Sequence, residues 1–256
     1  MRSVVATVVS YHQAAIQSSV RITEASVGEN RSSATGSGPV GAVLGFGAMS
    51  VPATRSSSAG PSSATDGGDV YFSVDIETDG PIPGPYSLLS FAMVPAGAFR
   101  HGRYVRPEAE PDSLYLELRP ISEQFDAEAL AVNRLDRERL RKEGLDPSDA
   151  MAQAAEWIAD QTGPGTPVLV AYPLSFDWSW LYWYFMKFAG ASPFKHSRCF
   201  DIKTAIAVKG RRGVARSGHR HLPEALRSAH SHTHHALEDA IAQADTFAKL
   251  MEWDGS

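Results

Sequence analysis

Two acidic residues close a strand-forming run and could hold a metal ion. Residues 70–74 are apolar and rich in β-formers, which predicts a buried strand. Asp75 and Glu77 follow two positions apart, and residues i and i+2 of a strand point to the same face. Neighbouring carboxylates beside a core are costly unless a cation lies between them, and a divalent metal supplies one. Taken alone, the pair also fits an acidic turn ended by Gly80.

A third carboxylate, Asp177, follows a second apolar run at residues 167–171. It opens a strongly aromatic segment, residues 176–188, which predicts a helix that packs in the core, with one or two rings able to stack on a base at a cleft edge. An acid in the first turn of a helix also stabilises the helix itself. Asp177 therefore does not identify a site on its own.

Histidines gather before the last predicted helix, which carries alanines at four-residue spacing from Ala236. If this helix begins after His235, His234 lies on the loop that leads in and Asp239 lies on the first turns, so both could reach one cleft. His235 is the adjacent rival of His234. A zinc or copper cluster among the histidines is an alternative, but their spacing fits no standard zinc finger and no cysteine lies nearby.

These three signals, in this order, resemble the motifs of the DEDDh branch of 3′–5′ exonucleases, which includes proofreading subunits, RNase T and oligoribonucleases and has the RNase H-like fold. The motifs are residues 75–78, residues 176–177 and the pair His234 and Asp239. Residues 128–135 also look like the family's segment between the third strand and a helix. The resemblance covers residues 69–252. The sequence departs from the family pattern ahead of the second motif. Many relatives have His or Gly followed by Asn there, and this chain has Tyr172-Pro173.

The resemblance implies a site and a reaction. The four metal-binding carboxylates fall on Asp75, Glu77, Asp177 and Asp239, and the general base falls on His234, favoured over His235 by the five-residue step to Asp239. Two Mg²⁺ (or Mn²⁺) ions are implied, because hard oxygen ligands select them. The expected reaction releases nucleoside 5′-monophosphates from the 3′ end of single-stranded DNA or RNA. The expected substrate contacts are Thr78, Phe176, Arg211 and Arg212.

The elements that must position these residues predict an α/β fold. Strands at residues 70–77, 87–94 and 114–118 are joined by short connections, which favours an antiparallel meander. A helical pattern at residues 125–140 and a helix from Pro147 to residue 162 lead to the strand at 167–171, which implies a parallel crossover. A short edge strand begins at Phe200. We therefore expect an RNase H-like, mixed five-stranded sheet, with three antiparallel strands and then parallel ones, flanked by helices.

A basic stretch lies between residues 195 and 227. Only Asp201 and Glu224 oppose its nine cations, which are Lys195, Arg198, Lys203, Lys209, Arg211, Arg212, Arg216, Arg220 and Arg227. The stretch fits either a solvated mobile loop or a loop that contacts phosphates.

Composition divides the chain. Residues 1–68 are rich in Ser, Gly, Ala and Pro and predict a disordered tail. The alternatives are a transit peptide or a translation start assigned too far upstream. Residues 69–253 predict the exonuclease domain. The apolar run at residues 4–9 is too short to span a membrane, so no membrane partner is expected. The single cysteine, Cys199, excludes an internal disulfide and fits a reducing cytoplasm.

Two other functions compete with an exonuclease acting on longer strands. One is an oligoribonuclease-like phosphodiesterase acting on very short oligonucleotides, against which the basic stretch argues. The other is a non-catalytic nucleic-acid-binding domain, against which the five intact site residues argue. Several relatives form dimers, so the resemblance leaves room for a homodimer. No segment of the sequence points to a polymerase partner, and none distinguishes DNA from RNA.

Overall fold

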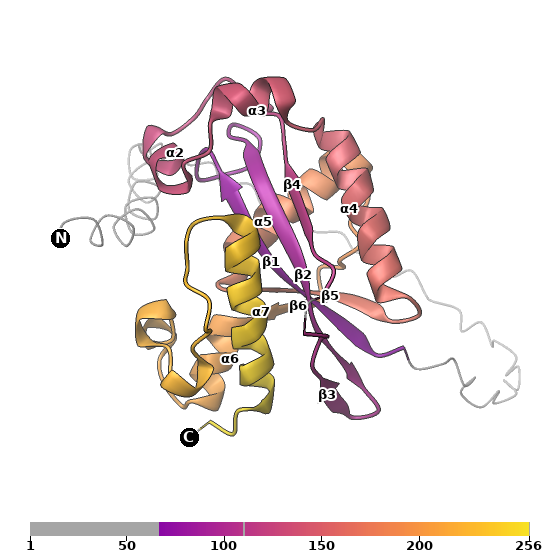
Figure 1. Cartoon of the computed structure of the whole chain (residues 1–256), viewed down its shortest axis with the longest axis vertical. Coiled ribbons are helices and arrows are strands. Elements are labelled where there is room, and N and C mark those ends of the chain that lie inside the picture. The colour runs from indigo at the N-terminus through magenta and orange to yellow at the C-terminus, as the bar shows by residue number, and fades with distance from the viewer. Residues whose placement is uncertain (1–66, 110, 256) are drawn as a thin grey trace, which may run out of the picture. The chain divides into compact units, whose positions relative to one another are not determined.

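The computed structural model describes residues 67–109 and 111–255 (Figure 1). The predicted disordered tail lies outside these residues, except for Gly67 and Gly68. Within the described part, a mixed sheet of six strands has the order β3-β2-β1-β5-β6, and β4 also pairs with β2. The α/β class and the RNase H-like arrangement are confirmed.

The central strand β1 (Asp69–Thr78) runs antiparallel to β2 (Leu88–Arg100) and parallel to β5 (Thr166–Ala171). The strand β6 (Cys199–Asp201) is parallel to β5. The predicted antiparallel and parallel halves of the sheet are therefore both present.

The second strand is longer than predicted, and its two ends pair with different partners. The strand β4 (Leu114–Glu117) pairs with residues 90–93 of β2, while β3 (Arg103–Val105) pairs with residues 98–100. The prediction omitted β3, which raises the strand count from five to six. Three residues are too few to show an alternating pattern.

The helical pattern at residues 125–140 forms two helices, α2 (Ala127–Asn133) and α3 (Arg137–Glu143). Arg134 follows α2 in the left-handed conformation, with φ 59°, and ends it. The carboxylate of Asp136 then accepts two backbone N–H groups and begins α3. The helix α4 (Pro147–Thr162) begins and ends as predicted, with Asp146 as its N-cap.

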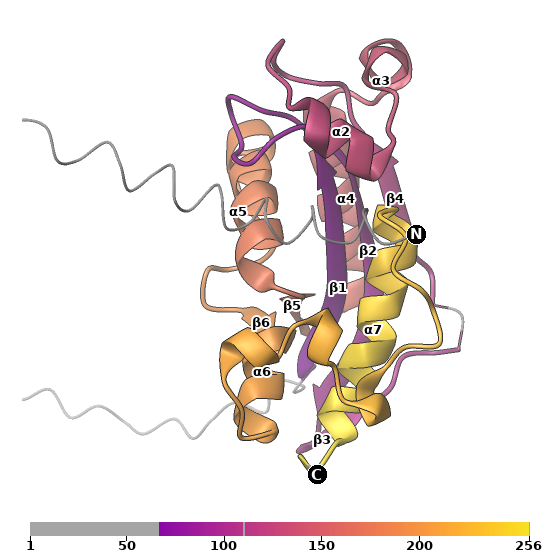
Figure 2. The same cartoon turned by 90° about the vertical axis from the view of Figure 1, so that its left-hand side faces the viewer.

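Helices cover both faces of the sheet, and Figure 2 shows α5 (Leu174–Tyr184) and α7 (Ala236–Glu252) on opposite sides of β1. Phe72 and Val74 pack with α4 and α5, where Trp180 and Tyr184 are fully buried, as expected of the aromatic helix. Tyr71 packs on the other face with α7 and α6 (Ile202–Lys209). The remaining short helices are η1 (Phe185–Ala189), η2 (Val214–Arg216), η3 (His219–His221) and η4 (Glu224–Leu226).

The register of β1 and β5 leaves the last residues of β1 without a partner strand on the β5 side. Pairing between the two strands ends at Ser73 and Val170, but β1 continues to Thr78. Beyond β5 the chain enters α5, so the last residues of β1 face the start of a helix. Ligands of open α/β sheets bind at such carboxyl ends. No helix among the described residues combines the length and apolar character needed to cross a membrane.

Candidate active site

Three carboxylates from distant parts of the chain meet near the carboxyl end of β1. Asp75 and Glu77 project from the α7 side of β1, the same face as Ser73, whose hydroxyl donates to the carbonyl of Ala240 on α7 at 2.8 Å. Asp239 lies in the first turn of α7. One oxygen from each of these three carboxylates lies within 4.8 Å of the others. The predicted i, i+2 pairing on one face is therefore confirmed, and α7 adds the third acid.

The fourth predicted carboxylate, Asp177, approaches the cluster from α5, on the other side of β1 from α7 (Figure 2). It is buried in the first turn of α5, which has no side-chain cap. Its carboxylate accepts backbone N–H groups of Asp177 itself and of Ile76, the residue between the two acids of β1. Its charge acts on both Asp75 and Glu77. Asp177 is outside the 4.8 Å group but faces the same space.

Burial and mutual repulsion shape the electrostatics of the cluster. Burial, followed by the charges of Asp239 and Asp177, raises the pKa of Glu77 to about 8. Burial raises the pKa of Asp177 to about 8, and burial with three neighbouring carboxylates raises that of Asp75 well above its usual range. Hard oxygen atoms with unrelieved negative charge are the donor set that a divalent cation of the Mg²⁺ type prefers. The residues present therefore fit such an ion.

Asp239 differs because its carboxylate is already hydrogen-bonded. Its two oxygens accept the backbone N–H groups of Thr233 at 2.8 Å and His234 at 2.9 Å, and Oδ2 lies 2.8 Å from Nδ1 of His232. Burial would raise the pKa of Asp239, but these contacts outweigh burial and lower it. The side chain of Asp239 therefore fixes the loop before α7 to the first turn of the helix through these contacts.

These hydrogen bonds account for the spacing of five residues between His234 and Asp239, because the carboxylate of Asp239 reaches back to the backbone N–H of His234. His234 has φ 60°, a left-handed conformation that is uncommon for residues other than glycine. Its imidazole belongs to a group of possible metal ligands with His232 and Asp239. The ring of His235 stacks instead on Tyr115, with centroids 4.8 Å apart. Of the two rivals, His234 is therefore the one that adjoins the carboxylates.

Two residues that sequence reasoning missed also touch the cluster. His232 contacts Asp239, as described, from a loop whose course the sequence does not reveal. Gln243 donates from Nε2 to Oδ1 of Asp75 at 2.8 Å. A signal for Gln243 was present, because it lies one turn after Asp239 and shares its helix face.

The four predicted substrate contacts lie in different structural environments. The hydroxyl of Thr78 donates to the carbonyl of Gly80 at 2.8 Å, and Phe176 is partly buried near Trp180. Arg212 donates to the carbonyl of His221 at 2.8 Å and so holds its own loop. Arg211 is exposed directly after α6. The neighbouring Lys209 donates from Nζ to the carbonyl of Leu250 at 2.7 Å, so this end of α6 lies beside the C-terminal end of α7 and not beside Asp239.

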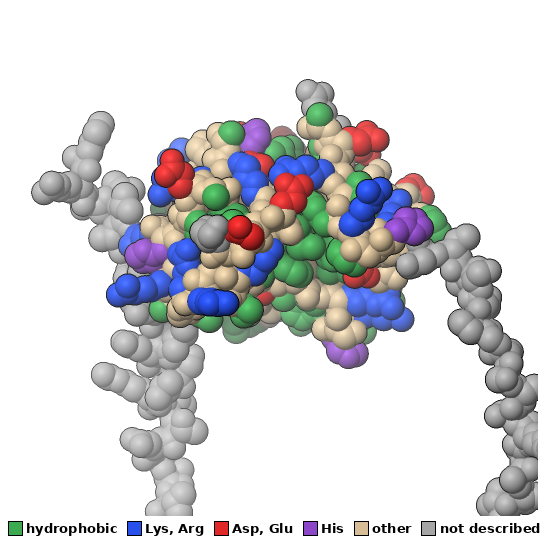
Figure 3. All heavy atoms as spheres, turned by 90° about the horizontal axis from the view of Figure 1, so that it is seen from below, with side chains coloured by type: hydrophobic (Ala, Val, Ile, Leu, Met, Phe, Trp, Pro, Cys, Tyr) green, Lys and Arg blue, Asp and Glu red, His purple; other side chains and the backbone are tan. Residues whose placement is uncertain are grey.

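The basic loop between α6 and α7 adjoins the site through aromatic contacts. The hydroxyl of Tyr172 donates to the carbonyl of Ser217 at 2.6 Å. The ring of His219 packs on Tyr172 and on His232, with centroids 4.0 Å and 5.5 Å away. His219 therefore links this loop to His232, which contacts the carboxylate of Asp239. Figure 3 views the molecule from below, onto the end that carries β3 and the C-terminal end of α7 in Figure 1, and shows lysine and arginine side chains there with acidic side chains among them.

The sheet order defines a protein of the RNase H-like fold, and the carboxylates at the end of β1 are a group that could hold a metal ion. Residues 135–251 match the family described as the Rv2179c-like 3′-5′ exoribonuclease domain. The chain is 35% identical over 181 residues to the 3′-5′ DNA exonuclease Cap18 of Escherichia coli, covering 70% of this chain and 90% of that protein. The chain belongs to the 3′–5′ exonuclease family.

Solved structures support the fold. A 3′-exonuclease that recognises a histone mRNA stem-loop has a TM-score of 0.55 and 11% identity, covering 74% of this chain and 65% of that one. Exonuclease I of E. coli in complex with a dA16 oligonucleotide has a TM-score of 0.50 and 16% identity, covering 72% and 41%. This chain therefore spans less than two thirds of either protein.

The raised carboxylate pKa values predict how the stability of the metal-free protein depends on pH. The folded protein retains protons on Glu77 and Asp177 that the unfolded chain releases above its ordinary carboxylate pKa. The free energy of unfolding should therefore fall between about pH 5 and about pH 8, by up to about 1.4 kcal/mol per pH unit for each retained proton. Asp239 has a lowered pKa and titrates below this window.

Thermal unfolding with a chelator present measures this dependence. The Glu77→Gln variant should show a shallower decline than the wild type, because one titrating group is gone. Added Mg²⁺ should reverse the decline, since a metal binds the deprotonated carboxylates. A wild-type profile that is flat, or that rises across this window without metal, would contradict the prediction.

Proposed function

We propose that residues 69–253 form a divalent-metal-dependent exonuclease domain. It hydrolyses the 3′-terminal phosphodiester of single-stranded DNA or RNA and releases nucleoside 5′-monophosphates. One observation carries the proposal: the carboxylate of Asp239 belongs both to the acid cluster with Asp75 and Glu77 and to the group that contains the imidazole of His234. Because Asp239 belongs to both groups, the carboxylates that would hold the metal lie close to the imidazole that would act as base. Both could therefore act on the same phosphate.

Asp75, Glu77, Asp177 and Asp239 would hold the metal, with two Mg²⁺ or Mn²⁺ ions as the proposed complement. Bound there, divalent ions would neutralise charge on the phosphate and on the oxygen that leaves. The protein's own contribution is to fix these oxygens before substrate arrives. Gln243 orients Asp75, and the backbone of the loop before α7 orients Asp239.

His234 is the proposed general base. Burial, followed by the charge of His232, lowers its pKa, so the imidazole is neutral at physiological pH and can accept a proton. It would take one proton from the attacking water, whose oxygen bonds to phosphorus. The bond from phosphorus to the 3′ oxygen of the preceding nucleotide breaks, and that oxygen takes up a proton from solvent. The shortened strand then ends in a 3′-hydroxyl.

The choice between DNA and RNA is open to direct test, because the matched family is described as exoribonuclease while the E. coli relative is named a DNA exonuclease. We propose that Thr78 and Phe176 lie beside the terminal nucleotide and that Arg211 and Arg212 lie along the strand. Arg212 would act by shaping its loop, as its bond to the carbonyl of His221 indicates.

Product analysis on 5′-labelled DNA and RNA tests the proposal. With Mg²⁺ or Mn²⁺ we expect a ladder that shortens stepwise from the 3′ end together with nucleoside 5′-monophosphates, and no products with chelator. Internal cuts, or equal activity in chelator, would contradict it. Degradation confined to the shortest oligomers would favour the oligoribonuclease-like alternative. Binding without products under any metal would favour a non-catalytic domain.

The hydrogen bond from Gln243 to Asp75 predicts a loss of activity that is separable from stability. The Gln243→Leu variant should lose about 10–100-fold in activity at low Mg²⁺, the usual cost of removing a partner that orients a metal ligand. Much of the loss should be recovered at high Mg²⁺. The matched control is Gln161→Leu, which removes an amide that donates to Asp112, away from the site. Equal losses in both variants would show a general structural effect instead.

A further inference from the structure

A second group of metal-ligating side chains adjoins the acid cluster. It consists of His232, His234 and Asp239, which each offer one ligand atom within 4.8 Å of the others. The rings of His232 and His234 lie 4.4 Å apart at 65°, and Nδ1 of His232 lies 2.8 Å from Oδ2 of Asp239. This group and the acid cluster share Asp239. It is not a zinc finger, and it comes from one loop and one helix turn.

The donor atoms of this group select a different metal from the acid cluster. Two imidazole nitrogens and one carboxylate oxygen suit Zn²⁺, whereas Mg²⁺ takes oxygen ligands. Tetrahedral zinc bonds of about 2.0–2.2 Å place the ligand atoms about 3.4 Å apart. The three ligand atoms, which lie within 4.8 Å of one another, must therefore move slightly closer together. The side chain of His232 is 49% exposed and can rotate to make that closure.

We propose that His232, His234 and Asp239 form an inhibitory zinc site. Its inhibitory effect rests on the proposed function, because zinc there would engage the base His234 and the carboxylate Asp239 at the same time. An imidazole that binds a metal through its lone pair cannot accept a proton, and Asp239 would no longer be available to the acid cluster. Zinc binding and catalysis would then exclude each other.

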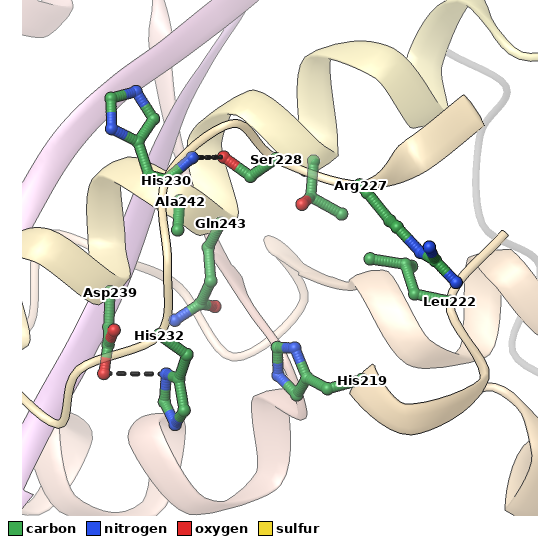
Figure 4. A pocket seen from close by; sticks show the side chains of 10 residues that line it. His219, Leu222, Arg227, Ser228, His230, His232, Asp239, Ala242 and Gln243 are labelled. Carbon is green, nitrogen blue, oxygen red and sulfur yellow. Dashed lines mark hydrogen bonds and ion pairs between the residues drawn. The ribbon is translucent and has the colours of Figure 1, made fainter. Parts of the chain in front are cut away.

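The surroundings provide an entrance and room for hydration. A cavity of about 210 Å³ is lined by His232, Asp239 and Gln243, among others. Figure 4 shows His232 between Asp239 and His219, with Gln243 reaching toward the same space. Gln243 is 6% exposed as a residue, and its Oε1 has no hydrogen-bond partner among the described residues. A buried acceptor of this kind can receive a hydrogen bond from water on a bound ion.

Zinc binding to the full chain without Mg²⁺ tests the site independently of activity, by equilibrium dialysis with metal quantification. The His232→Ala variant should bind zinc at least about tenfold more weakly, since loss even of an outer partner costs about 10–100-fold. His196→Ala is the control, because this exposed histidine lies before β6, outside both the group and the cavity. It should match the wild type.

A second variant separates this site from the acid cluster. Asp75→Asn combined with Glu77→Gln removes two acidic ligands but keeps His232, His234 and Asp239, so zinc binding should persist. Loss of zinc binding in this double variant, with full binding in His232→Ala, would place zinc among the carboxylates and overturn the proposal.

Inhibition supplies the functional readout. At fixed Mg²⁺, nuclease activity of the wild type should fall with added zinc, and His232→Ala should need at least about tenfold more zinc for the same fractional inhibition. Equal sensitivity of the two proteins would overturn the inhibitory role. A wild type with no nuclease activity whose zinc binding still depends on His232 would instead refute the proposed function and leave the metal site standing.

Discussion

Replacing Asp75 with asparagine should abolish metal-dependent nuclease activity while making the metal-free protein more stable at pH 8. Asparagine keeps the shape and an oxygen that can accept the hydrogen bond from Gln243, but it removes one of the charges offered to the cation. Metal ions in such sites contribute several kcal/mol to the transition state. The loss should therefore be on the order of 10³-fold or more.

The stability effect has the opposite sign because Asp75 is held among like charges. Its pKa is raised by burial and then by Asp177, Glu77 and Asp239, so deprotonation at high pH costs folding free energy. Without metal at pH 8, Asp75→Asn should melt higher than the wild type by about 2–4 °C for each kcal/mol gained. The difference should shrink as the pH falls, because protonation of Asp75 in the wild type removes the charge that is held among like charges.

The control for Asp75→Asn is Asp245→Asn, which removes an acid on α7 whose carboxylate accepts from Lys249 and from the backbone N–H of Ala229, outside the acid cluster. It should retain activity. Turnover near the wild-type rate in Asp75→Asn would remove Asp75 from the proposed catalytic site. An inactive variant that also melts lower at every pH would mean that the charge stabilises the fold, against the electrostatics described above.

The parts of the fold that sequence patterns could predict are those with long, regular signals. β1, β5 and α4 each carry an apolar run or a helical face bounded by capping or breaking residues, and their parallel crossover follows from their order. β3 was missed because three residues carry no period. The break between α2 and α3 was missed because it depends on the left-handed conformation of Arg134, which side-chain pattern does not encode.

In the candidate site too, residues on regular elements could be placed from the sequence, whereas a residue on an irregular loop could not. The period of a strand places Asp75 and Glu77 on one face, and the start of a helix places Asp239, but only the family resemblance implied that these three acids meet. His232 was not predicted, because its contact with Asp239 depends on the path of an irregular loop. The preference for His234 over His235 rested on spacing, and the structure supplies its cause in the two backbone N–H groups that Asp239 accepts.

Replacing His234 with asparagine should lower the rate at saturating Mg²⁺ by about 10²–10⁴-fold, the usual contribution of a general base. Asparagine is preferable to alanine because it tolerates the left-handed backbone at φ 60°, so the loop should keep its hydrogen bonds to Asp239. The loss then reports the missing proton acceptor. Magnesium affinity, measured separately, should change far less than the rate.

The pH profile provides an independent check on this role. A base must be unprotonated to act, and burial followed by the charge of His232 lowers the pKa of His234. At saturating Mg²⁺ the wild-type rate should therefore fall only below about pH 6.5, the ordinary histidine pKa, and this fall should be absent in His234→Asn. His235→Ala removes a ring that stacks on Tyr115 and should keep both rate and profile. If His235→Ala lost the acid limb and His234→Asn kept it, the base would be His235, and the spacing argument would fail.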